Sequence, residues 1–234
     1  MHRLRRLTRR LLASLTASIG DVAFGMEDGA VSIAGLVFGV AASTSDSQIV
    51  VLAGATGAVA GAVSMMAGTY LDVESEQRRT AARVLRVRER VATDPARARR
   101  RVLHRLERAG FTEAEQASVI AAYTRNPEAM VADIAAYELG AAPSARPASP
   151  ATHAAWMFVA DLFAAGVPVV PFMLFDIDTA RIVSLVLTGA LMGALGLARA
   201  RIAHEPPIRT ALQTMAIAGA AALAGVLIGW LVTS

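Results

Sequence analysis

Apolar residues gather in five windows along the chain, and each window is long enough for a helix that crosses a membrane. A bilayer core of about 30 Å needs roughly 20 consecutive, mostly apolar residues in an α-helix. Windows of this length lie at 20–42, 49–71, 152–174, 180–199 and 211–232. The pattern therefore predicts an all-α, polytopic membrane protein with five transmembrane helices.

One long polar stretch, 72–150, separates the second apolar window from the third. Asp94 and Asn126 each precede a proline, and Thr112 with Glu115 has the spacing of a capping box, so helices are expected to begin at these points. The stretch predicts a soluble insert of three or four amphipathic helices that ends in a proline-rich linker. The expected organisation is a basic lead-in with transmembrane helices 1 and 2 at 1–71, the helical insert and linker at 72–150, and transmembrane helices 3 to 5 at 151–234.

The composition supports this division into a membrane part and a soluble part. Hydrophobic residues make up 55% of the 234 and charged residues 18%, which requires the two kinds to be segregated along the chain. There is no cysteine, which excludes a disulfide framework, a thiolate metal site and a cysteine nucleophile. The sequence contains no phosphate-binding loop, nucleophile elbow or zinc-protease motif, so enzyme activity is not expected.

The positions of arginine predict the orientation in the membrane. All 23 basic residues are arginine, and nearly all lie near the N-terminus, in the insert or at 199–209. The two opposite loops contain Asp46, Asp176 and Asp178 against only Arg181. Because basic loops are retained on the cytoplasmic side, the N-terminus and the insert are expected inside and the C-terminus outside. Full-length spans and a basic N-terminus suit a bacterial inner membrane.

The first two apolar windows contain candidate ligands for a divalent metal ion. The first contains Asp21, Glu27 and Asp28, and acidic residues inside a span usually mark a functional site because they are costly there. The second contains Met65 and Met66, whose thioether sulfurs favour late first-row metals in low oxidation states. Two other interpretations remain open: the methionines pack as ordinary apolar residues, and Asp28 with the following glycine forms a turn near the membrane surface.

Several motifs, taken in order, resemble the vacuolar iron transporter family over nearly the whole chain. No single motif is specific to that family, but the order and spacing of all the motifs together are specific to it. They are Asp28-Gly29-x-Val31-Ser32, the continuation from Gly35 to Gly39, Ser64-Met65-x-Ala67-Gly68-x-Tyr70, Glu138-Leu139-Gly140, Gly166-x-Pro168-x-x-Pro171 and the run from Gly225 to Gly229.

The resemblance implies a specific activity. Members of that family are homodimers with five spans and a cytoplasmic helical insert, and they exchange ferrous or manganous ions for protons and move them out of the cytosol. The resemblance further implies that Asp28 and Met65 line the ion path and that Met66 lies beside it on the same span. The ions are transported substrates, so no permanently bound cofactor is expected.

The chain also departs from the family pattern. Thr69 stands where the family usually has a glutamate, and Glu27 stands where a small polar residue is usual, so Glu27 is a candidate to replace the missing carboxylate. The family's insert binds metal through glutamates, of which Glu138 remains here. Glu74, at the membrane end of the insert, is a further candidate to receive an ion, although acidic residues at such positions are often only solvated. Because the arginines that replace the other glutamates repel cations, no cluster of several metals is expected in the insert.

The remaining questions concern other partners and other functions. Two roles stay open for the arginine-rich insert: contact with anionic lipid headgroups, and a partly solvated structural anchor on the cytoplasmic side. Residues 76–110 contain no aromatic side chain to stack on bases, so nucleic acid is not an expected partner. His153 and the other histidines lack the spacing of metal ligands and are expected at the surface or at the membrane interface. Two functions stay open: a proton-coupled exporter of Fe²⁺ or Mn²⁺, and a family relative that has lost transport and has a structural or regulatory role in the membrane.

Overall fold

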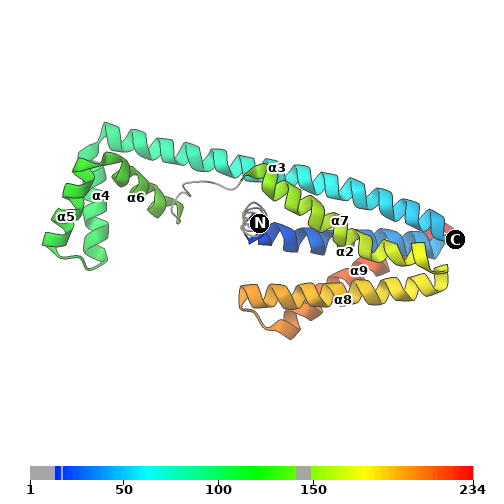
Figure 1. The fold of residues 1–234 in the computed structure, drawn as a ribbon. Coiled ribbons are helices and arrows are strands. Elements are labelled where there is room, and N and C mark those ends of the chain that lie inside the picture. The colour runs from blue at the N-terminus through cyan, green and yellow to red at the C-terminus, as the bar shows by residue number, and fades with distance from the viewer. Residues whose placement is uncertain (1–13, 17, 141–148, 234) are drawn as a thin grey trace, which may run out of the picture. The chain divides into compact units, whose positions relative to one another are not determined.

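The structure is a computed structural model that describes residues 14–16, 18–140 and 149–233. The predicted basic lead-in at 1–10, most of the predicted linker and Ser234 lie outside these residues. The described residues form helices and no strand, so the all-α prediction is confirmed. The helices are α2 (Ile19–Ser43), α3 (Ser47–Thr93), α4 (Pro95–Arg108), α5 (Glu113–Arg125), α6 (Pro127–Leu139), α7 (Pro150–Leu174), α8 (Ile177–Ala203) and α9 (Pro207–Thr233), as Figure 1 shows.

Five of the described helices are long and apolar enough to cross a membrane, judged by their length and composition. They are α2, α3, α7, α8 and α9. Each contains one of the apolar windows of the sequence. The joints between neighbouring helices are short: Thr44 to Asp46 joins α2 to α3, and Phe175 with Asp176 joins α7 to α8. Asp176 caps α8, since its carboxylate accepts a hydrogen bond of 3.1 Å from the Thr179 backbone N–H.

Helix α3 continues far beyond the apolar window that we expected to end at residue 71. It runs without interruption to Thr93, so the second apolar segment and the first helix of the insert are one helix. No proline or glycine occurs between Gly68 and the Asp94-Pro95 pair that begins the next helix. Arg78 and Glu74, one turn apart, form an ion pair of 2.9 Å that supports the polar part of the helix.

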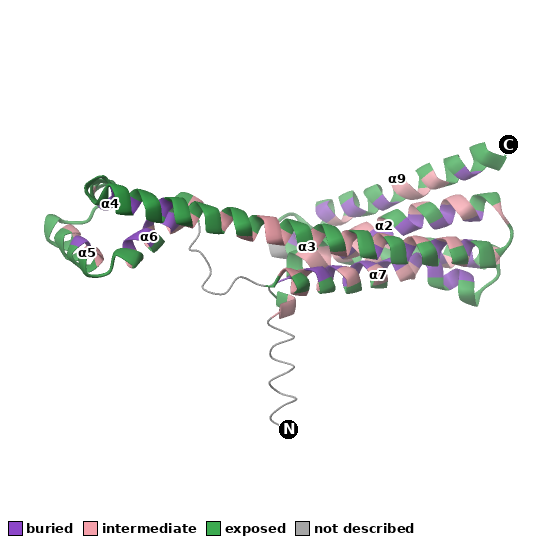
Figure 2. Ribbon diagram, turned by 90° about the horizontal axis from the view of Figure 1, so that it is seen from above, coloured by how far each residue is buried: buried purple, intermediate pink, exposed green. Residues whose placement is uncertain are grey.

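The chain divides at Leu71 and again at Ala148 into two compact units. In the first unit, α2 packs against both α7 and α9, and α8 packs against α7 and α9 (Figure 1). Gly225 and Gly229 of α9 lie against Gly35 and Gly39 of α2 so closely that a Cβ atom on either α9 glycine would overlap the α2 backbone. Small residues at such a contact let two helices approach closely in a membrane. The buried residues of α2 and α7 face their neighbours, while much of α3 is exposed (Figure 2).

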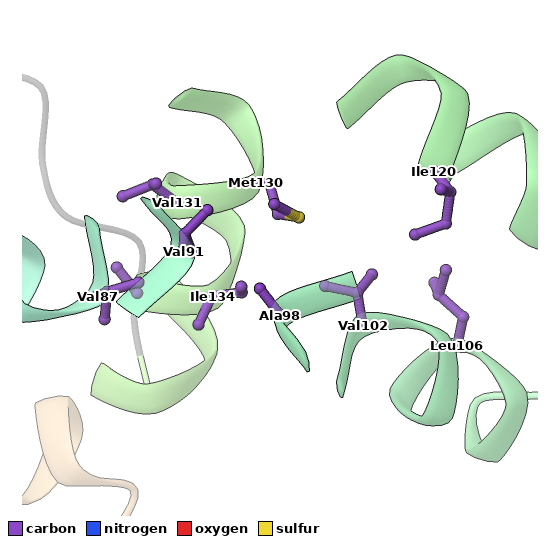
Figure 3. Packing of buried hydrophobic residues seen from close by; sticks show 10 residues of the cluster. Val87, Val91, Ala98, Val102, Leu106, Ile120, Met130, Val131 and Ile134 are labelled. Atoms are coloured by element: carbon purple, nitrogen blue, oxygen red, sulfur yellow. The ribbon is translucent and has the colours of Figure 1, made fainter. Parts of the chain in front are cut away.

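The second unit contains α4, α5, α6 and the polar end of α3, and it has a hydrophobic core of its own. Figure 3 shows Val87 and Val91 of α3, Val102 of α4, Ile120 of α5 and Ile134 of α6 among the residues of that cluster. The expected amphipathic helices are therefore present, with α3 supplying the first of them.

The caps that the sequence predicted in this unit are also present. Asp94 and Asn126 each accept a hydrogen bond from the backbone N–H three residues on, and Thr112 with Glu115 forms a complete capping box. Gly110 and Gly140 follow α4 and α6 with φ of 86° and 72°, a left-handed conformation that glycine adopts without strain.

Candidate ion-binding site

Asp28 is a partly buried residue in the middle of α2, which is an apolar helix. The turn that the sequence left open does not form at Asp28, because the helix continues through Gly29 to Ser43. The backbone carbonyl of Asp28 accepts a hydrogen bond of 2.7 Å from the Ser32 hydroxyl, which satisfies that hydroxyl within the helix. Asp28 is therefore an acidic residue held at a fixed point of a regular apolar helix.

A second carboxylate, which the sequence analysis did not identify, lies next to this point. Asp161 of α7 is only 2% exposed, and its Oδ1 atom has no hydrogen-bond partner among the described residues. A Cβ atom at Gly29 would overlap the Asp161 backbone carbonyl and would lie 2.9 Å from Oδ1. Asp28, the residue before Gly29, is close enough to Asp161 for the two carboxylates to interact electrostatically. The glycine thus leaves the space in which the α7 carboxylate approaches α2.

One face of α3 is turned toward the same carboxylate. A Cβ atom at Gly61 would be 4.0 Å from Asp161 Oδ2, so that face of α3 is turned toward Asp161. Residues four apart share one face of a helix, which places Met65 on the Gly61 face, one turn further along. Met66 is rotated from Met65 by about 100° around the helix axis. Both methionines are partly buried. The structure therefore brings Asp28, Asp161 and the Met65 face of α3 into one region of the helical bundle.

Glu27 has a cationic partner. Its Oε2 atom lies 3.2 Å from Nη1 of Arg199, near the end of α8, while its Oε1 atom is buried without a hydrogen-bond partner in the described structure. The ion pair joins α2 to α8. Glu27 was predicted as a candidate to replace the carboxylate missing at Thr69, and no pattern in the sequence marks Arg199, 172 residues away, as its partner.

Glu74 and Glu138 belong to the second compact unit, and arginines neutralise both of them. Glu74 pairs with Arg78 at 2.9 Å. Glu138 pairs with Arg90 at 2.5 Å and has the Nη1 atom of Arg101 at 3.9 Å. A divalent ion that bound to either carboxylate would compete with a guanidinium already in place.

The described parts of the chain contain no group of three or more histidine, aspartate or glutamate residues placed to hold a metal ion. The arrangement around Asp28 is instead a pair of carboxylates, Asp28 and Asp161, with the Gly61 face of α3 beside Asp161.

Comparison with known proteins identifies relatives of this chain. The sequence profile of the VIT family matches residues 19–230 of this chain. The chain is 29% identical over 208 residues to "Vacuolar iron transporter 1" of Arabidopsis thaliana, a match that covers 87% of this chain and 83% of that protein. It is 27% identical over 209 residues to "Vacuolar iron transporter" of Centaurea cyanus, covering 88% and 85%. It is 27% identical over 207 residues to "Vacuolar iron transporter 2" of Oryza sativa subsp. japonica, covering 88% and 84%. These names refer to a vacuole and give no support to the bacterial inner membrane expected from the arginine pattern.

Proposed function

This chain belongs to the VIT family, and with that membership as the premise we propose that it exports divalent iron or manganese from the cytosol in exchange for protons. Members of this family are transporters and not enzymes, and the chain is accordingly an integral membrane protein that carries metal ions. The observation that supports the finer proposal best is the position of Asp28, an acidic residue inside an apolar helix with a second carboxylate beside it. An acidic residue in such a place usually serves an ion pathway.

A carboxylate is suited to couple a metal ion to a proton. Both cations bind to the same oxygen atoms, so Asp28 holds either the metal or the proton and not both at once. Met65 and Met66 would add soft thioether ligands, which favour Fe²⁺ over harder ions such as Mg²⁺. In this scheme Asp28 supplies the exchange and the methionines supply part of the selectivity.

The proposed orientation places the insert, 72–150, in the cytoplasm and the C-terminus outside, with five spans. Arginine asymmetry supports it, and the insert is a compact unit with its own core. Its many arginines are placed to contact anionic lipid headgroups as well as solvent. Reporter fusions at Gly140 and at the C-terminus test this topology, and a cytoplasmic C-terminus would rule out the five-span arrangement.

The proposed homodimer rests chiefly on the family resemblance. Glycines recur on the second and fourth spans, and small residues of this kind let helices, including those of two subunits, approach closely. They are Gly54, Gly57 and Gly61 and then Gly189, Gly193 and Gly196. In the structure Gly54 faces Val169 and Val37, and Gly196 faces Ala211, so both glycines serve contacts within one subunit. The mass of the protein in mild detergent, measured over a range of concentrations, distinguishes a dimer from a monomer.

The second function, a family relative that no longer transports, is supported by Thr69 and by the arginine partners of Glu74 and Glu138. Asp161 weighs against it, because an unpartnered carboxylate buried in an apolar helix has no evident structural purpose. The two functions therefore differ in whether Asp28 and Asp161 act on an ion.

Purified protein in sealed proteoliposomes tests the proposal directly. We expect Mn²⁺ or Fe²⁺ to move faster than in empty vesicles under a proton gradient, with a matching movement of protons. Asp28→Asn keeps the size of the side chain but removes its exchangeable proton, so both movements should stop. Asp46→Asn, a change of the same kind in the exposed α2–α3 joint, is the control. A wild-type protein that moves neither ion under a gradient of either sign would exclude the transporter.

A further inference from the structure

Asp161 is buried at a position where a negative charge needs a compensating cation. Asp161 is 2% exposed, and its Oδ1 atom has no hydrogen-bond partner in the described structure. The carboxylate of Asp28 is close enough to interact with it electrostatically. An ionised carboxylate without a partner is very costly in an apolar surrounding, and two neighbouring carboxylates repel each other. A divalent cation between them removes both costs.

The Asp161 contact is one of three regularly spaced contacts between α2 and α7. Asp161 lies against Gly29, and Met157, one turn earlier on α7, places its sulfur 2.7 Å from where a Cβ of Gly25 would be. One turn earlier again, Nδ1 of the His153 ring contacts the carboxylate of Asp21. The three α7 residues are spaced by four, so they lie along one face of that helix.

The outermost contact is itself largely enclosed. Only 15% of the His153 side chain and 28% of the Asp21 side chain are exposed, and the His153 Nδ1 atom also lies 3.3 Å from the hydroxyl of the buried residue Ser18. The sequence predicted a surface or interfacial position for His153, and this enclosed position differs from the first of them. The alternative interpretation is that the Asp21–His153 pair serves only to join two helices.

Chemistry favours a role beyond helix packing. Imidazole nitrogen, thioether sulfur and carboxylate oxygen are three ligand types for late first-row divalent ions. Here all three follow one another along α7, and each faces α2 at an acidic residue or a glycine. Joining two helices accounts for the Asp21–His153 pair, but it gives no reason for Asp161, whose Oδ1 atom has no hydrogen-bond partner among the described residues.

We propose that Asp161 and Asp28 together bind the transported divalent ion at an inner site. Asp21 with His153 forms an outer site, near the N-terminal end of α2, from which the ion passes Met157 to reach the inner site. This inference rests on the proposed transport function and names the residues of its route. Asp161 then supplies the second membrane carboxylate that the chain lacks at Thr69. The close contacts at Gly25 and Gly29 mean that α2 and α7 must separate for the ion to pass.

The inner site is tested with Mn²⁺ binding to the purified full-length protein in detergent. Asp161→Asn should weaken Mn²⁺ binding at least about tenfold. Removing a residue that only hydrogen-bonds to a metal ligand already lowers metal affinity by about 10- to 100-fold. Asp28→Asn should have a similar effect, and Asp46→Asn should have none. Unchanged Mn²⁺ affinity in a folded Asp161→Asn protein would overturn the inner site.

A measurement on the wild-type protein covers the case in which Asp161→Asn does not fold. A hydrophobic carbodiimide modifies carboxyl groups in apolar surroundings, and mass spectrometry locates the modified residue. Saturating Mn²⁺ should protect Asp161 from modification. Equal modification with and without Mn²⁺ would count against the inner site as firmly as an unaffected variant.

The outer site is tested by pulsed electron paramagnetic resonance of bound Mn²⁺, which detects a directly coordinated nitrogen. At saturating Mn²⁺ the nitrogen signal should be present in the wild type and in His104→Gln, a change at an exposed histidine, and absent in His153→Gln. A signal that survives His153→Gln would overturn the outer site. Transport by the wild type is scored separately: if it fails, the proposed function fails, whereas normal transport with unaffected variants refutes only the route.

Discussion

The backbone carbonyl and the carboxylate of Asp161 lie against Gly29, where a side chain at residue 29 would meet both of them. Gly29 is buried and is followed on α2 by an uninterrupted apolar helix. The absence of a side chain at one residue therefore determines where a charged group on another helix lies. The acidic residue and the glycine are 132 positions apart in the sequence, so only the folded bundle relates them.

Replacing Gly29 by alanine should displace α7 from α2. The added methyl group would overlap the Asp161 backbone and crowd its carboxylate, and overpacking of this kind typically costs about 1–3 kcal/mol. We expect a lower thermal midpoint in detergent and loss of Mn²⁺ transport. Gly166→Ala on α7, where a Cβ meets nothing within 4 Å, is the matched control and should be neutral or slightly stabilising. Equal midpoints for both variants would show that α2 and α7 are not in close contact at Gly29.

Much of the fold was predictable because its signals are local. Long apolar windows specify helices that fit a membrane, and the Thr112–Glu115 capping box and the Asp94 cap mark helix starts within four residues of sequence. The length of α3 was not predicted, because a change from apolar to polar composition at residue 71 was interpreted as the end of a helix. A change in solvent does not end a helix when no helix-breaking residue accompanies it.

The site was only partly predictable, for a different reason. Asp28 and Met65 could be selected because each is unusual within its own apolar window. Asp161 was detectable by the same criterion, as an acidic residue in the window 152–174, but its closeness to Asp28 depends on the packing of α7 against α2. The Arg199 partner of Glu27 likewise comes from a distant helix. Contacts of this kind have no periodic pattern in the sequence.

The Glu27–Arg199 pair should couple α2 to α8. Glu27→Gln and Arg199→Gln should each lower the thermal midpoint, and the double variant should lose less than the sum of the two, with a coupling of about 1 kcal/mol for a partly exposed pair. A double-mutant cycle in detergent measures this value. A weaker Mn²⁺ affinity in Glu27→Gln together with unchanged affinity in Arg199→Gln would instead identify Glu27 as a metal ligand.

The isolated insert, residues 72–140, should be helical but should bind divalent metal weakly. Arg78 occupies Glu74, and Arg90 with Arg101 occupies Glu138. A divalent ion must displace these guanidinium groups and approach a surface rich in arginine. Titration calorimetry with Mn²⁺, Zn²⁺ and Fe²⁺ measures the affinity, and several tight sites would contradict the prediction. Arg90→Gln is expected to strengthen binding at Glu138.

Acid should destabilise the insert partly through Glu115. The Thr112 backbone N–H donates to this carboxylate, and that hydrogen bond lowers the pKa of Glu115 below the ordinary value for glutamate. A carboxylate whose pKa is lower in the folded state stabilises the fold at pH values above its unfolded-state pKa. This stabilisation is lost as the pH falls toward the folded-state pKa. The free energy of unfolding of the insert, measured with urea, should therefore fall more steeply with decreasing pH in the wild type than in Glu115→Gln. That variant keeps the cap but has no carboxylate to titrate. Equal slopes would show that the capping box is not formed in solution.

Met65 and Met66 should differ in their effect on metal selectivity. Met65 shares the face of Gly61, which is turned toward Asp161, whereas Met66 is rotated by about 100° from it. Leucine has nearly the volume of methionine but no sulfur, so Met65→Leu removes a soft ligand with little change in packing. We expect Met65→Leu to reduce Fe²⁺ transport more than Mn²⁺ transport in proteoliposomes, because Mn²⁺ depends more on carboxylate oxygen. Met66→Leu is the matched variant and should leave the Fe²⁺ to Mn²⁺ ratio nearly unchanged. A ratio altered only by Met66→Leu would place the ion on the other face of α3, and a ratio altered by neither would remove both sulfurs from the coordination of the ion.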